Sequence, residues 1–136
     1  MNGKASPPTL RDVPAILTPD HAVDLKAAST PNFYQELDSD YGGFKGHVLI
    51  SEHAFSADWG VWEVHPAGDE FIYLLEGAAD FVCYAEGRET VTRLDTPGQF
   101  VVVPRDAWHT ARTTVPTRAL FVTPGAGTRH SDDPRA

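Results

Sequence analysis

The chain of 136 residues has little of several features that mark other protein classes. Its single cysteine, Cys83, excludes an internal disulfide framework and a cysteine-rich zinc site. Because Cys83 lies in the apolar run 81–84, we interpret it as a small buried side chain rather than a nucleophile. No apolar stretch approaches the roughly 20 residues that span a bilayer, and residues 1–9 lack the apolar segment of a secretory signal. We therefore expect a cytoplasmic protein.

Positive charge is also scarce, since 11 Lys and Arg residues stand against 19 Asp and Glu and leave a net charge of -8. The acidic residues are spread along the chain rather than gathered in a tail. Such a charge distribution repels phosphate backbones and anionic lipid surfaces. We therefore expect neither nucleic acid nor a membrane as a partner. The length suits one domain with a single hydrophobic core.

Short apolar runs separated by turn residues follow one another from Lys45 onward. This pattern, with no helix between the runs, is typical of an all-β sandwich or barrel. The predicted strands cover 45–55, 59–65, 70–76, 79–85, 89–94, 99–103, 107–114 and 117–123.

The segments outside the β domain are less regular. We assign residues 1–44 to an irregular N-terminal arm that packs on the barrel or on a partner, residues 45–125 to the barrel, and 126–136 to a C-terminal tail. Within the arm, 13–17 is a possible edge strand, and 33–37 is predicted as about one turn of helix, ended by the polar residues 38–40.

Two of the predicted strands are apolar on both faces, 81–84 and 100–103. A sheet with one face in water would not carry such strands, so their outer faces must be covered. The cover could be the N-terminal arm or a second subunit. We predict a homodimer packed through this outer sheet.

Candidate ligands for a metal lie in two blocks about forty residues apart. Glu63 and His65 project from the same face of one strand, and they are either ordinary exposed residues or an ionisable pair inside the barrel. Glu70 follows a tight turn and can return alongside His65, and His109 begins another strand beyond a proline turn. Two imidazoles and one or two carboxylates converging from three strands would suit Fe(II), Mn(II), Zn(II) or Ni(II).

The remaining candidates receive a plainer interpretation. The other four histidines are expected to be surface or packing residues, and they are His21, His47, His53 and His130. Of these, His53 could face the pocket. The tryptophans Trp59, Trp62 and Trp108 are core or interface candidates, of which one or two could line the pocket mouth. Arg105 and Arg112 could hold an anionic substrate, but exposed arginines beside a loop are the simpler interpretation.

The two blocks together resemble the paired motifs of the cupin superfamily, G-x5-H-x-H-x(3,4)-E-x6-G and G-x5-P-x-G-x2-H-x3-N. The residues of this sequence that match are His65, Glu70, Gly77, Gly98, Pro104 and His109. The resemblance covers residues 58–113 and is greatest to small single-domain proteins of the cupin type-2 conserved barrel group. It implies a double-stranded β-helix, that is, a jelly-roll barrel.

The sequence departs from these motifs at three positions. Glu63 stands at the first histidine, Asp106 at the second motif's inner glycine, and Thr113 at its final asparagine. The metal set that the resemblance implies, three histidines and one glutamate, would become Glu63, His65, Glu70 and His109. A set with two carboxylates is harder and favours Mn(II) or Fe(II).

The resemblance implies a metal-dependent enzyme of the oxygenase, isomerase or decarboxylase type that acts on a small polar organic molecule. Within it, Glu63 would be a fourth ligand or a catalytic general base. The alternative is a barrel that binds or senses a small molecule without catalysis, with a degenerate metal site, and Glu63 makes that alternative more credible than a complete motif would.

Overall fold

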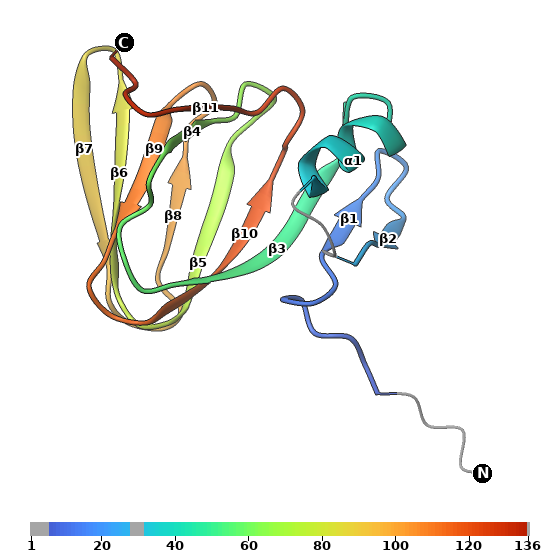
Figure 1. The fold of residues 1–136 in the computed structure, drawn as a ribbon, viewed down its shortest axis with the longest axis horizontal. Helices are drawn as coiled ribbons and strands as arrows, with labels where there is room; N and C mark the ends of the chain where they lie inside the picture. Colours follow the sequence, from blue (N-terminus) through green and yellow to red (C-terminus); the bar gives the residue numbers. More distant parts are fainter. Residues whose placement is uncertain (1–5, 28–31, 136) are drawn as a thin grey trace.

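Two antiparallel β-sheets form the body of the protein in a computed structural model that describes residues 6–27 and 32–135. One short helix accompanies them (Figure 1). The elements are β1 (Ala15–Leu17), β2 (Val23–Leu25), α1 (Phe33–Asp40), β3 (Val48–Phe55), β4 (Trp62–Val64), β5 (Glu70–Glu76), β6 (Ala79–Ala85), β7 (Arg88–Leu94), β8 (Phe100–Val103), β9 (Trp108–Arg112), β10 (Thr117–Thr123) and β11 (Arg129–Ser131).

The two sheets contain six and five strands. Their strand orders are β2-β1-β3-β10-β5-β8 and β11-β4-β9-β6-β7. Strands that are distant in the sequence are neighbours, as where β10 lies between β3 and β5. The all-β jelly-roll barrel expected from the sequence is confirmed, with α1, β1 and β2 gathered at one end (Figure 1).

Most predicted strands lie where the alternation placed them. Differences concentrate at the ends of the chain, where β1 is not an edge strand because β2 pairs on its outer side. The helix runs to Asp40 instead of ending near Leu37, and the Tyr41 backbone N–H donates to the Leu37 carbonyl to close its last turn. The segment 126–136 contains β11, which pairs with β4 at the edge of the five-stranded sheet. Within the described residues no helix is long and apolar enough to cross a membrane.

The core fills the space between the sheets with alternate residues of facing strands. Ile72 and Leu74 of β5, Phe81 of β6, Ala111 of β9 and Phe121 of β10 are buried in one cluster. This alternation is the period-two pattern of a strand with one face inside. It places Glu70, two residues before Ile72, on the inner face as well.

The outer faces of the two apolar strands are covered differently. On β6, Val82 is buried, and Tyr84 lies under the guanidinium of Arg135, 4.4 Å from the ring centroid. On β8, Phe100 and Val102 remain 55% and 48% exposed. The chain therefore covers part of one sheet with its own C-terminal segment and leaves an apolar strip on the other.

A homodimer through the β8 strip remains a prediction. Phe100→Lys should give a monomer, because dimerisation would bury the new charge in an apolar contact. Val91→Lys is the matched control, since Val91 is 58% exposed on β7 of the other sheet. Light scattering should find a wild-type dimer and a dimeric Val91 variant. A wild-type monomer at high concentration would contradict the prediction.

Candidate metal centre

One row of side chains crosses the five-stranded sheet at the candidate site. Glu63 of β4 pairs with His109 of β9 on one side and with His130 of β11 on the other. Directly paired residues of antiparallel strands place their side chains on the same face. Glu63 is therefore flanked by two imidazoles. Its carboxylate lies 3.8 Å from His109 Nε2 and 2.7 Å from His130 Nε2.

A second group comes from the connection between the two sheets. His65 follows β4, and after the turn 66–69 Glu70 begins β5 on the facing sheet. The turn is held to the second motif, because the Arg105 backbone N–H donates to Asp69 Oδ1 at 2.8 Å. The Asp106 N–H also donates to the His65 carbonyl at 3.2 Å. The two sequence blocks are thus fastened together at the site.

The departures Asp106 and Thr113 are both accommodated by the local structure. Asp106 has a φ of +66°, the left-handed conformation that favours the glycine of the motif but that aspartate also tolerates. Thr113 donates from its hydroxyl to the Ala78 carbonyl at 2.5 Å. The turn before His109 therefore keeps its backbone conformation with aspartate at position 106, and Thr113 is hydrogen-bonded after the strand.

Three of the four predicted ligands place donor atoms within 4.8 Å of one another: Glu63, His65 and His109. Glu70 lies against this group, with Oε1 2.9 Å from His109 Nε2 and Oε2 3.3 Å from His65 Nε2. His65, Glu70 and His109 are buried, whereas the Glu63 side chain retains 19% exposure. Three such residues could hold a metal ion, with Glu70 as a neighbouring fourth.

The electrostatics of the buried pair follow from this proximity. Burial acts to raise the pKa of Glu70, but the imidazoles of His109 and His65 overcome it and lower that pKa to about 2. Burial acts to lower the pKa of His109, but the carboxylates of Glu70 and Glu63 overcome it and raise that pKa above its ordinary value. Glu70 is therefore held in its negative form, and His109 binds a proton more readily than a free imidazole does.

Several buried polar atoms at the centre make no hydrogen bond of normal geometry among the described residues and contact one another only as ion pairs. These atoms are His65 Nε2, Glu70 Oε1 and His109 Nε2. Buried polar atoms are nearly always partnered, and buried charges are costly unless they are paired or bind a metal. Two imidazole nitrogens and a carboxylate oxygen left without hydrogen bonds at one point fit the donor set of a divalent cation.

Residues behind these donors set their orientation. The Thr128 hydroxyl donates to the Gly125 carbonyl at 2.9 Å, so it must accept from His65 Nδ1 at 2.8 Å. His65 therefore carries its proton on Nδ1 and turns the lone pair of Nε2 toward the centre. On the other sheet, the Thr123 hydroxyl donates to Glu70 Oε2 at 2.5 Å.

Thr128→Val should weaken divalent-metal binding about 10- to 100-fold, because it removes the acceptor that fixes His65. Thr128→Ser retains the hydroxyl and should bind the metal as the wild type does. Titration of the metal-free variants with Mn(II) measures the difference. Equal affinities for the valine and serine variants would show that Thr128 does not orient the ligand.

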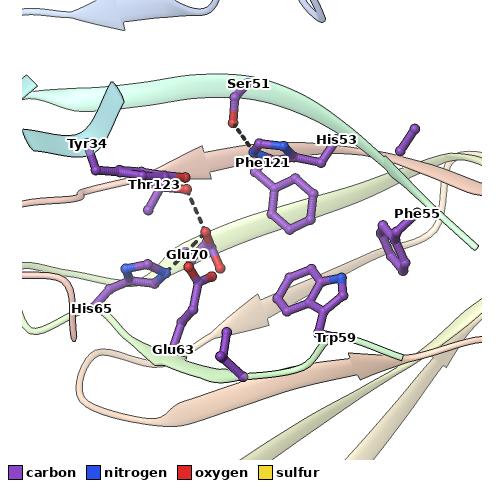
Figure 2. A pocket seen from close by; sticks show the side chains of 12 residues that line it. Tyr34, Ser51, His53, Phe55, Trp59, Glu63, His65, Glu70, Phe121 and Thr123 are labelled. Atoms are coloured by element: carbon purple, nitrogen blue, oxygen red, sulfur yellow. Dashed lines mark hydrogen bonds and ion pairs between the residues drawn. The ribbon is translucent and has the colours of Figure 1, made fainter. Parts of the chain in front are cut away.

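A cavity of about 250 Å³ opens beside the centre (Figure 2). Glu63, His65 and Glu70 lie at one end of it. Aromatic residues form the other end (Figure 2), and they are Phe55, Trp59 and Phe121. Tyr34 reaches into the cavity from α1 (Figure 2). Of the predicted pocket-mouth tryptophans, Trp59 is the one that lines the cavity.

Sequence reasoning missed three residues of the site. Thr128 and His130 lie in the segment interpreted as a tail, and Tyr34 lies in the arm. The stretch Arg129-His130-Ser131 is too short and too polar to be recognised as a strand from the sequence. No local pattern indicates that Tyr34 reaches the barrel interior, because that contact depends on how α1 docks.

Comparisons with known proteins agree on the fold. A family model described as a cupin domain matches residues 51–123. Among solved structures, an oxalate oxidase aligns with a TM-score of 0.51 at 14% identity, covering 60% of this chain and 44% of that one. Oxalate decarboxylase from Bacillus subtilis aligns with a TM-score of 0.51 at 17% identity, covering 62% and 23%.

Peruvianin-I, a cysteine peptidase from Thevetia peruviana latex, is also similar. It aligns with a TM-score of 0.50 at 18% identity, covering 60% of this chain and 54% of that one. This chain thus spans about half or less of each of these three structures, and at such identities the likeness shows the fold alone. A search of curated proteins finds no match.

Proposed function

The chain belongs to the cupin family, and we propose that it is a metal-dependent enzyme acting on a small organic molecule bound in the 250 Å³ cavity. The observation that supports this proposal is the convergence of imidazole nitrogens and carboxylate oxygens at one end of that cavity, where the buried ones contact one another only as ion pairs. The proposed ligands are His65, Glu70 and His109, with Glu63 as a fourth ligand or as a base.

Mn(II) and Fe(II) are the proposed metals, ahead of Zn(II) and Ni(II). Two carboxylates make the donor set harder than one built from imidazoles. The structure of Bacillus subtilis oxalate decarboxylase to which this chain is similar is described as having Mn(II) centres. A divalent ion with open positions supplies Lewis-acid activation of a bound carbonyl or enediolate oxygen.

The protein groups in this proposal bind, orient and move protons. Glu63 lines the cavity, and its carboxylate is the most exposed of the four candidate groups, so it can accept a proton from a bound substrate. His130 holds Glu63 Oε2 by a hydrogen bond of 2.7 Å and limits its rotation. His65 and Glu70 are fixed from behind by Thr128 and Thr123.

Glu63→Gln tests the proposed base. Turnover should fall about 10²- to 10⁴-fold, because the amide cannot accept the proton. Asp80→Asn, at an exposed carboxylate on β6, is the control and should be unaffected. The assay compares metal-free and Mn(II)- or Fe(II)-loaded protein for oxygen uptake and product formation with small diols, diketones and thiols.

The metal content of the Glu63 variant assigns its role, because a base variant keeps the metal and a ligand variant loses it. Turnover that survives both metal removal and Glu63→Gln would contradict the proposal.

One observation favours a second candidate, a barrel that binds or senses a small molecule without catalysis. Each carboxylate already has a histidine partner within the protein, since His109 lies 2.9 Å from Glu70 and His130 lies 2.7 Å from Glu63. Under this candidate, thermal shifts appear with sugars or organic acids in metal-free protein, and no turnover accompanies them.

A further inference from the structure

The cavity beside the candidate centre has two chemically different ends. The carboxylates of Glu63 and Glu70 belong to the first end (Figure 2). The second end is aromatic, where the Trp59 ring lies 5.6 Å from Phe55 edge to face and 5.8 Å from Phe121. A ligand that fills this cavity therefore places polar atoms at one end and an apolar group at the other.

The composition of the cavity wall also bears on the charge of its ligand. Among its described lining residues none is Lys or Arg. The two arginines near His109 in the sequence are engaged elsewhere. Arg105 donates to the Ala67 carbonyl at 3.1 Å, and Arg112 lies exposed at the end of β9. No lysine or arginine of the described lining is thus placed to form an ion pair with an anionic substrate inside the cavity.

Charge balance leads to the same conclusion for the loaded and the metal-free protein. Two neutral imidazoles and two carboxylates cancel the charge of a divalent cation, so the loaded centre has no excess positive charge. In the metal-free protein, Glu63 lies 2.7 Å from His130 and Glu70 lies 2.9 Å from His109, so these carboxylates and imidazoles offset each other. A dianion therefore gains no net attraction in either case.

We propose that the cavity binds an uncharged molecule with one flat aromatic ring, whose neighbouring hydroxyl groups point toward Glu63 and Glu70, and that it discriminates against small dianions. Trp59, Phe55 and Phe121 contact the ring, and the Tyr34 hydroxyl donates a hydrogen bond to a ligand oxygen. The inference rests on the proposed function for the choice of site, and it names the substrate class.

Size and side-chain chemistry support this class. A cavity of about 150 Å³ suffices for benzene in another protein, so 250 Å³ admits one substituted ring. Aromatic walls favour a flat ring because edge-to-face and offset contacts add to apolar burial. A tyrosine hydroxyl is protonated at neutral pH, so the hydroxyl of Tyr34 at the cavity wall can donate.

Nuclear magnetic resonance titration of the metal-free protein tests the inference, with the indole N–H signals of Trp59, Trp62 and Trp108 as reporters. Three probes are compared: catechol, trans-cyclohexane-1,2-diol with the same oxygens on a puckered ring, and oxalate. Catechol should shift the Trp59 signal and bind at least about fivefold more tightly than the diol. Oxalate should not shift it.

Two variants locate the contacts. Trp59→Leu should weaken catechol binding about two- to tenfold, the worth of an aromatic pair, whereas Trp62→Leu outside the cavity should not. Because Trp59 also packs on Phe81, Tyr34→Phe provides a second test on a half-exposed residue. That variant should weaken catechol about fivefold, the worth of one hydrogen bond, and leave toluene binding unchanged.

The inference is overturned if oxalate binds more tightly than catechol, if the diol equals catechol, or if catechol binds without shifting Trp59. Its failure is distinguishable from failure of the proposed function. If the protein binds a metal but prefers oxalate, only the proposed ligand class is contradicted. If catechol binds at Trp59 but the protein binds no metal, only the proposed metal-dependent enzyme is contradicted.

Discussion

Gly77→Ala is expected to destabilise the protein by about 3 kcal/mol or more, the combined cost of a strained backbone and a backbone overlap. Gly77 ends the first motif in the turn between β5 and β6, with a φ of +87°. A β-carbon there would lie 2.2 Å from the Pro116 carbonyl oxygen and 2.8 Å from the Thr117 Cα. Both are backbone atoms and cannot rotate away, so the start of β10 must shift.

Gly87→Ala is the matched control for this prediction. Gly87 has a φ of +76° in the turn between β6 and β7, but nothing lies within 4 Å of its added β-carbon. The Gly87→Ala substitution should lower the free energy of unfolding by about 1 kcal/mol, the penalty of the left-handed backbone alone. Urea unfolding measures both variants. Equal losses would show that the close approach of Gly77 to β10 does not contribute to stability.

His109→Gln should lower divalent-metal affinity more than about 100-fold, which exceeds the usual effect of residues behind a ligand. His109 is fully buried, and its Nε2 lies 2.9 Å from Glu70 Oε1 and 3.8 Å from Glu63 Oε1. Glutamine fills similar space but offers a poorer ligand. A saturating metal that raises the wild-type melting temperature should leave the variant nearly unchanged.

His53→Gln is the control for the His109 variant. His53 lines the same cavity, but it is outside the group of convergent donors, and its Nε2 lies 3.3 Å from the Ser51 hydroxyl. Its replacement should leave metal affinity unchanged. If both variants lose affinity equally, the metal binds in the cavity at a position other than the one proposed.

Alternation and motif spacing predicted the barrel and the residues that meet inside it. Period-two patterns place the strands because one buried face needs apolar residues at every second position. The same rule places Glu70 beside Ile72 and Leu74 on the inner face. The spacing of the two blocks then predicted that His65 and His109 approach each other, and their ring centroids lie 5.2 Å apart.

Contacts made by the ends of the chain could not be predicted in this way. The strand β11 is only three residues long and polar, so no apolar alternation marks it. Yet His130 of this strand forms a hydrogen bond with Glu63, and Thr128 just before it forms one with His65. Tyr34 reaches the cavity because α1 docks at the barrel's end, a tertiary contact without a local signal. Such residues are found only when the chain is folded.

Metal stoichiometry of protein purified without a chelator or an affinity tag tests the central claim most directly. Elemental analysis should find one divalent ion per chain, Mn or Fe, in the wild type and in His53→Gln. It should find almost none in His109→Gln. Substoichiometric metal in the wild type that His109→Gln leaves unchanged would contradict the metal centre.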